Sequence, residues 1–274
     1  MQNGLISGIA ITIYVLTAAI LAWQLFKLRG KYSDSDNTLK KFSVIALGLV
    51  AVLLHGIVLY DSLFVPEGIN LGVFNAISLI TFLIAFTILV ASLTNPVQNL
   101  GILLLPVAAL AILLSRIYPV NHTILTAHAI ELKTHILLSI VAYSLLSIAA
   151  VQSMALAIQD HHLRNKKPGG FIRALPPLQT MESLLFQMIA FGFFIHSLSL
   201  ITGIIYLEDI FAQHLVHKST LAVIAWLIFA TLLWGRWRFG WRGATAIRWT
   251  LGGFSALALS YVGSKWVMEI ILGR

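Results

Sequence analysis

A continuous apolar run, NLGVFNAISLITFLIAFTILVAS at residues 70–92, contains no Asp, Glu, Lys or Arg. About 20 apolar residues are enough to cross the hydrocarbon core of a bilayer as a helix. Seven further runs of this kind lie at residues 4–26, 42–60, 98–118, 131–158, 182–206, 219–234 and 247–272. Because backbone groups in hydrocarbon must be paired within their own segment, each run is expected to be a helix. The sequence therefore predicts an all-α integral membrane protein, with residues 1–274 forming one polytopic domain, a single bundle of about eight transmembrane helices.

The composition supports the same class of protein. Hydrophobic residues make up 59% of the 274 residues and charged residues 10%, against roughly 25% charged in an ordinary soluble domain. This balance excludes a water-soluble globule. The chain has no cysteine, which excludes disulfides, thiolate zinc, iron–sulfur clusters and covalent haem attachment through C-x-x-C-H. A metal or haem must therefore be held by nitrogen, oxygen or methionine sulfur.

The formal charge of +8 comes from cations that flank the apolar runs. Cations in such positions fix the orientation of a membrane protein, so nucleic-acid binding is not expected. Because the first cation, Lys27, follows the first run, we interpret that run as a retained helix and not as a signal peptide. Thirteen of the 18 Lys and Arg residues follow the first, fifth and seventh runs: Lys27, Arg29, Lys31, Lys40, Lys41, Arg164, Lys166, Lys167, Arg173, Arg236, Arg238, Arg242 and Arg248. The positive-inside rule assigns these loops to the cytoplasm and both termini to the extracytoplasmic side.

Histidines gather at the opposite, predicted outer ends. If the helix of the fifth run begins early, His128, Glu131 and His135 are spaced i, i+3 and i+7 and share one face. A carboxylate one turn from a histidine can hold its ring and raise its strength as a ligand. His214 and His217 are three residues apart before the seventh run and also share a face in a helix. Two imidazole patches on different helices suit bis-histidine ligation of haem. A zinc site could use the same residues, and solvated or packing histidines are the plainer alternative.

Two histidines within the apolar runs are weaker candidate ligands. His196 is the one ionisable side chain near a predicted helix centre, and His55 lies toward the outer end of the second run. A lone histidine in a membrane helix is more often a neutral residue bonded to a neighbouring helix. No Asp, Glu, Lys or Arg lies at mid-span, which disfavours an ion-coupled pump. A transporter would have to line its cavity with His196, Asn75, Gln187 and scattered Ser and Thr.

The segment Trp234–Gly243 is dense in Trp and Arg at the predicted inner interface. Aromatic belts and positive-inside charges both belong at that depth, so the segment is interpreted first as a membrane anchor. Docking of a cytoplasmic partner or contact with an anionic lipid is the alternative.

Several motifs in the second half of the chain carry a family resemblance. They are Phe191-Gly192, Ile201-Thr202-Gly203, Ile224-Ala225-Trp226-Leu227 followed by a Trp-Gly-Arg helix end, Gly240-Trp241-Arg242-Gly243, Gly252-Gly253-Phe254 and Tyr261-Val262-Gly263. Together with the segment from His135 to Tyr143 they resemble the cytochrome c assembly family, which includes CcsA, CcmC and HemX. The resemblance covers about residues 130–265 and is strongest to the small YpjD/HemX-like branch, in which an eight-helix core occurs without a large soluble domain.

The resemblance implies a haem site near the outer face. In that family outward-facing histidines flank a tryptophan-rich segment and hold haem for delivery to apocytochrome c, and His135 matches the first flanking position. Two features depart from the pattern, since residues 207–218 contain no Trp and residues 265–274 contain no histidine. We therefore hypothesise that His214 or His217 replaces the missing partner of His135.

These inferences favour a bacterial inner-membrane, multi-pass, b-type haem-binding protein related to cytochrome c assembly. It would hold or relay non-covalent haem b, with His135, His214 and His217 as candidate iron ligands and His128 and Glu131 beside them. Expected partners are haem, membrane lipid and a cytochrome-maturation or other membrane protein. The chain has no Cys, G-x-S-x-G, H-E-x-x-H or glycine-rich phosphate loop, so catalysis is not expected. A cofactor-free regulatory or structural subunit on the same fold and a small-molecule transporter stay open as alternatives.

Overall fold

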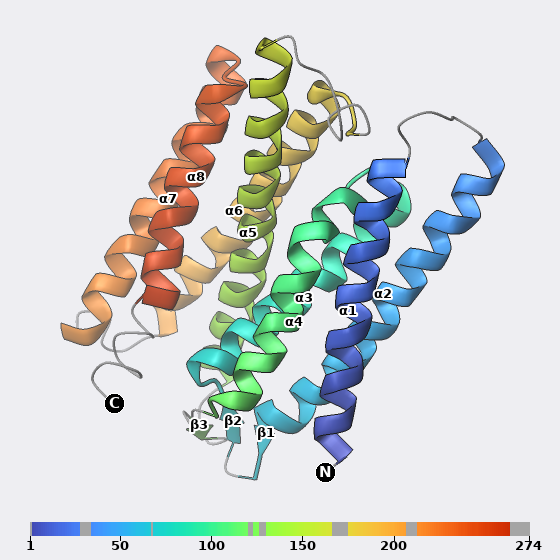
Figure 1. Cartoon of the computed structure of the whole chain (residues 1–274). Helices are drawn as coiled ribbons and strands as arrows, with labels where there is room; N and C mark the ends of the chain where they lie inside the picture. Colours follow the sequence, from blue (N-terminus) through green and yellow to red (C-terminus); the bar gives the residue numbers. More distant parts are fainter. Residues whose placement is uncertain are drawn as a thin grey trace. The chain divides into compact units, whose positions relative to one another are not determined.

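The computed structural model describes residues 2–27, 34–66, 68–119, 123–125, 130–165, 175–206 and 213–263. Eight α-helices account for most of these residues, as the apolar runs predict. The helices form two compact units (Figure 1). Unit 1 comprises residues 1–126 and 165–176, and unit 2 comprises residues 127–164 and 177–274. Each unit is described by itself below.

Unit 1 is built from four successive helices. α1 (Gln2–Lys27) packs against α2 (Asp34–Leu63) and α4 (Gly101–Ile117), and α3 (Val73–Thr94) packs against the same two helices. A 3-10 turn, Gln98–Leu100, leads into α4. Small side chains such as Ala10, Ala51 and Ala108 are completely buried between the helices. Small residues let membrane helices approach closely, which is where their packing energy arises.

A small antiparallel sheet extends unit 1 beyond α2. It consists of β1 (Phe64–Val65), β2 (Gly68–Asn70) and β3 (Thr123–Leu125), paired in that order. Phe64 lies opposite Ile69, and Ile69 lies opposite Ile124. The sequence does not predict this sheet, because strands of two or three residues are too short to show an alternating pattern.

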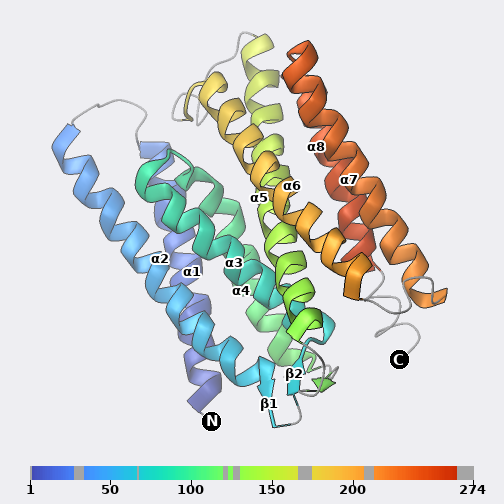
Figure 2. The ribbon, with the colours of Figure 1, turned by 180° about the vertical axis from the view of Figure 1, so that it is seen from behind.

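Unit 2 has the same order of packing. It consists of α5 (Ile130–Arg164), α6 (Leu178–Tyr206), α7 (Gln213–Phe239) and α8 (Ala244–Ala258), which continues as a π-helical turn over Leu259–Gly263. Each helix packs against the next, and α8 packs back against α5. Figure 2 shows α6 crossing α5 obliquely, with α7 beside α8.

Glycines on α6 allow the close packing of α5 against it. Gly192, Ser199 and Gly203 are spaced i, i+7 and i+11 and so lie on one face of α6. A Cβ at Gly192 would come within 2.9 Å of the Leu146 side chain, and one at Gly203 within 3.0 Å of the His135 ring. The close approach also lets the hydroxyl of Ser139 bond that of Ser199 at 2.7 Å.

Within the parts of the chain that the structure describes, seven helices are long and apolar enough to cross a membrane. Their apolar parts are Gly4–Leu25, Lys41–Leu63, Val73–Thr94, Gln98–Ile117, Leu132–Arg164, Leu178–Ile205 and Lys218–Phe239. The chain is thus a multi-pass membrane protein, and seven of the eight predicted runs are matched by such helices. The eighth span stays a prediction, because α8 and its π-helical turn are described only to Gly263. The single-domain interpretation and the outward orientation of both termini also stay predictions.

Candidate functional site

His135, the first candidate ligand, lies in the second turn of α5 and its side chain is half-buried. Its Nδ1 lies 2.9 Å from the main-chain oxygen of Ser199 and 3.3 Å from Oγ1 of Thr202, both on α6. Gly203 lies directly against the ring, where a Cβ would come within 3.0 Å of Cε1. Ser199, Thr202 and Gly203 of α6 therefore fix both the position and the orientation of this imidazole.

The contact with Ser199 determines which ring nitrogen remains for a ligand. A main-chain carbonyl can only accept a hydrogen bond, so Nδ1 carries the proton and donates it to Ser199. In the neutral ring the lone pair then belongs to Nε2. Histidines that bind metals typically donate their other ring N–H to a carbonyl or carboxylate, which fixes the tautomer. His135 has this arrangement.

The beginning of α7 packs against the turn that follows α8, and Tyr261 of that turn lies 5.8 Å from the Tyr143 ring of α5, two turns after His135. Lys218 Nζ lies 5.3 Å from the centre of the Tyr261 ring, and its main-chain oxygen accepts a 2.7 Å hydrogen bond from Ser260. Both partners belong to the π-helical turn Leu259–Gly263. Helix segments of this type often occur at functional sites.

The other outer candidates are only partly described. α7 begins at Gln213, so His214 and His217 lie in its first turns, one residue or more before Lys218. Glu131 lies four residues before His135 in α5, on the same side of the helix. The side chains of these three residues, and His128 as a whole, lie outside the described residues. Their convergence on His135 stays a prediction.

His55 lies in unit 1 and both of its ring nitrogens are bonded. The residue is completely buried, with Nδ1 3.2 Å from the Tyr14 hydroxyl and Nε2 2.9 Å from Oγ of Ser78. The rings of Tyr14 and Phe82 meet it edge to face. A ligand at His55 would have to displace one of these hydroxyl groups.

His196 is buried at the α6–α7 contact. Its Nε2 lies 3.2 Å from the main-chain oxygen of Ala222, and the neighbouring Ser197 hydroxyl accepts a 2.8 Å bond from the Trp226 indole. These bonds join two helices inside unit 2, as expected for a neutral histidine in a membrane helix.

The polar side chains that a transporter could use have local partners. The Asn75 amide lies near the main-chain oxygens of Ser62 and Asn70, at 3.3 and 3.4 Å. Gln187 bonds Ser183 one turn away on α6. Among the side chains that the structure describes, no three His, Cys, Asp or Glu residues converge as a metal site would require.

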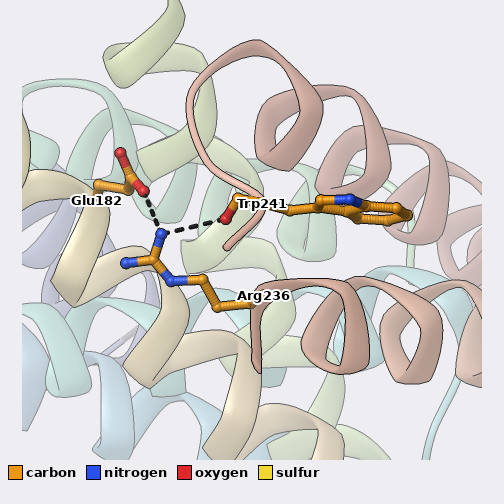
Figure 3. Close-up of polar contacts among 3 residues, drawn as sticks. All are labelled: Glu182, Arg236 and Trp241. Carbon is orange, nitrogen blue, oxygen red and sulfur yellow. Dashed lines mark hydrogen bonds and ion pairs between the residues drawn. The ribbon is translucent and has the colours of Figure 1, made fainter. Parts of the chain in front are cut away.

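Sequence reasoning missed one polar contact at the other end of unit 2. Glu182 near the start of α6 pairs with Arg236 near the end of α7, with 2.7 Å between Oε1 and Nη1 (Figure 3). The same Nη1 donates to the main-chain oxygen of Trp241 at 3.1 Å. Arg236 and Glu182 are 54 positions apart in the chain and lie on separate helices, whereas Arg236 and Trp241 are only 5 positions apart. A single sequence contains no periodic signal for such a pair.

Taken together, the chain is an α-helical multi-pass membrane protein with an oriented histidine near one end of its second four-helix unit. The family model for the cytochrome C assembly protein matches residues 43–272, and the chain belongs to this family. The match begins far upstream of the residues 130–265 that carry the resemblance by motif. It therefore includes helices of both units.

Relatives of known name support the predicted branch. Inner membrane protein YpjD of Escherichia coli (strain K12) is 32% identical over 234 residues, covering 84% of this chain and 86% of the relative. Protein HemX of Brevibacillus brevis is 22% identical over 266 residues, covering 92% and 93%. Cytochrome c biogenesis protein CcsA of Synechococcus sp. (strain CC9902) is 26% identical over 152 residues, covering 47% and 50%. No solved structure matches the chain.

Proposed function

We propose that this protein binds haem b non-covalently and holds or relays it near the extracytoplasmic face of the bacterial inner membrane. The observation that carries the proposal is the hydrogen bond from Nδ1 of His135 to the main-chain oxygen of Ser199. This bond leaves Nε2 as the nitrogen with a free lone pair, on a ring that α6 already holds in place. Such a ring can bind iron without first being ordered.

The second ligand in this proposal is His214 or His217. Both precede Lys218 on α7, which contacts Tyr261, and the Tyr261 ring lies 5.8 Å from that of Tyr143 on α5; these contacts support placing the start of α7 on the same side of unit 2 as His135. Two neutral imidazoles from different helices are a common ligand set for haem iron. The Lys218 ammonium would offer a cation to the carboxylates at the haem edge. Haem is here a cargo, and the residues named bind and orient it.

The location and partners follow from family membership and charge. The name of the YpjD relative supports an inner-membrane location, and the name of the CcsA relative supports a role in cytochrome c biogenesis. The positive-inside rule assigns the His135 end of α5 to the extracytoplasmic side. A membrane protein of cytochrome maturation is therefore the expected recipient or partner, with membrane lipid around the helices.

The test is an absorbance spectrum of the protein purified in mild detergent, as isolated and after titration with hemin. The wild-type protein should show a Soret band, and its reduced-minus-oxidised spectrum should be that of a low-spin bis-histidine haem. His135→Ala should abolish that spectrum. His214→Ala and His217→Ala, made singly, should identify which of the two serves as the second ligand.

His162→Ala is a matched control, since that imidazole bonds the main chain of its own helix at the far end of α5. Its spectrum should equal that of the wild type. A Soret band that survives both His135→Ala and the double variant at positions 214 and 217 would remove these residues from the proposal. A protein that stays colourless even with added hemin would instead favour a cofactor-free regulatory or structural subunit.

A further inference from the structure

The turn between α7 and α8 presents an exposed surface of aromatic and arginine side chains. We define the α7–α8 turn surface as Trp237, Arg238, Phe239 and Arg242, all exposed, with Trp237 at 82% and Phe239 at 60%. This surface lies at the end of unit 2 opposite His135, so it is separate from the proposed haem site. The haem proposal does not use any of its residues.

Behind this surface the aromatic rings form a continuous series. The Trp234 and Phe239 rings meet edge to face at 5.4 Å, and Phe239 stacks on Trp241 at 6.4 Å. Trp241 in turn contacts Trp249 on α8 at 5.5 Å. The Arg238 guanidinium lies 5.9 Å from the centre of the Phe239 ring. One arginine is therefore placed over an aromatic layer that spans both helices.

The backbone of the turn is fixed in its conformation. Gly240 and Gly243 adopt φ values of +67° and +56°, which residues with a side chain rarely adopt. Trp241 packs so closely over Gly235 that no Cβ could be accommodated there. Figure 3 shows how Arg236 ties the main-chain oxygen of Trp241 to Glu182 of α6. The turn backbone is thus packed over α7 through Trp241 and joined to α6 through Arg236.

The charge of the turn is unbalanced. Arg236 is neutralised by Glu182 and stacks on the Phe186 ring at 4.5 Å. Arg238 and Arg242, by contrast, have no carboxylate partner within the described parts of the chain. Guanidinium groups bind phosphate oxygens through paired hydrogen bonds. An exposed Trp side chain beside them is most stable at a membrane interface, where one end of the indole ring contacts apolar chains and the other contacts water.

We propose that the α7–α8 turn surface binds the headgroup of an anionic membrane phospholipid. The phosphate lies between Arg238 and Arg242, and Trp237 and Phe239 contact the glycerol and upper acyl region. A lipid is the occupant, and not free phosphate, because only a lipid also covers the two exposed aromatic rings. The positive-inside rule assigns this end to the cytoplasmic leaflet, whose anionic lipids attract basic segments.

The experiment titrates delipidated protein in detergent with phosphatidylglycerol, phosphatidylcholine or inorganic phosphate, and counts bound lipid by native mass spectrometry. The wild-type protein should bind phosphatidylglycerol in preference to phosphatidylcholine. Arg238→Gln and Arg242→Gln should each weaken phosphatidylglycerol binding about fivefold, the ratio that corresponds to about 1 kcal/mol per cation near an anionic surface. The double variant should lose on the order of 25-fold.

Arg164→Gln is the matched control. Arg164 is also an exposed arginine at the predicted inner end of unit 2, but it already pairs with Asp160 at 2.9 Å. Its removal should leave phosphatidylglycerol binding unchanged. Equal binding of the two lipids by the wild type, or an equal loss in the control, would overturn the proposal. Displacement of phosphatidylglycerol by millimolar inorganic phosphate would overturn the choice of a lipid as the occupant. Thermal melts of each variant show that the fold is retained, and the single variants serve if the double variant unfolds.

Discussion

The contact between Gly203 and His135 gives the sharpest prediction for the proposed site. In Gly203→Ala the new Cβ would lie 3.0 Å from Cε1 and 3.3 Å from Nδ1 of His135, whereas ordinary contacts begin at 3.4 Å. The ring must therefore move by about 0.4 Å, the difference between 3.4 and 3.0 Å. A displacement of this size can lengthen the 2.9 Å bond to Ser199 beyond the usual range of up to about 3.2 Å. Loss of such a supporting contact typically lowers metal affinity about 10- to 100-fold.

We expect Gly203→Ala to lower hemin affinity on the order of tenfold. The measurement is a hemin titration of the Soret band in detergent. Gly252→Ala in α8 is the matched control, because nothing lies within 4 Å of its new Cβ. Alanine favours a helix interior over glycine by about 0.5–1 kcal/mol, and thermal melts of both variants distinguish a loss of haem from a loss of the fold. Wild-type affinity in Gly203→Ala, or an equal loss in Gly252→Ala, would refute the assigned role of the α6 glycine.

Two further predictions concern packing and orientation. Gly253→Ala should lower the free energy of unfolding by about 1–3 kcal/mol, because its Cβ would come within 2.9 Å of the Phe229 ring. Thermal melts of Gly253→Ala and of Gly252→Ala, the adjacent glycine of the same helix, test this prediction. Equal melting temperatures of the two variants would contradict the packing argument. Since the chain contains no cysteine, single thiols report orientation. Tyr118→Cys should react with a membrane-impermeant maleimide in intact spheroplasts and Arg242→Cys only after permeabilisation, and the reverse pattern would show that the positive-inside assignment is wrong.

The helices could be predicted because the bilayer imposes a simple rule on the sequence. Any segment in hydrocarbon must satisfy its own backbone, so apolar length alone indicates a helix. The run at residues 70–92 accordingly corresponds to α3 at Val73–Thr94. The sheet of β1, β2 and β3 lies outside the helices and follows no such rule. Its strands pair residues as distant as Ile69 and Ile124, and this contact depends on where the helices bring the chain.

The candidate site could be predicted in part for a related reason. The spacing of polar residues along one helix and the family resemblance both indicate His135. Its partners Ser199 and Thr202 are 64 and 67 residues away, on the neighbouring helix. Contacts between helices depend on rotation about each helix axis, and a single sequence does not specify that rotation. The motif containing Thr202 and Gly203 contributes to the family resemblance, but its contacts with His135 exist only when α6 is packed against α5.

The three described membrane histidines differ in which ring nitrogen they use, and this difference separates ligand candidates from structural residues. His55 uses both nitrogens for hydroxyl groups, which leaves none for a metal. His196 is bonded through Nε2 to Ala222, so its remaining nitrogen is Nδ1, the one next to its own backbone. His135 is bonded through Nδ1, and its remaining nitrogen is Nε2 at the far edge of the ring. Since an iron porphyrin is broad, the far nitrogen can reach it with far less obstruction than the near one. The preference for His135 therefore follows from hydrogen-bond geometry, and residue type alone would not distinguish these three side chains.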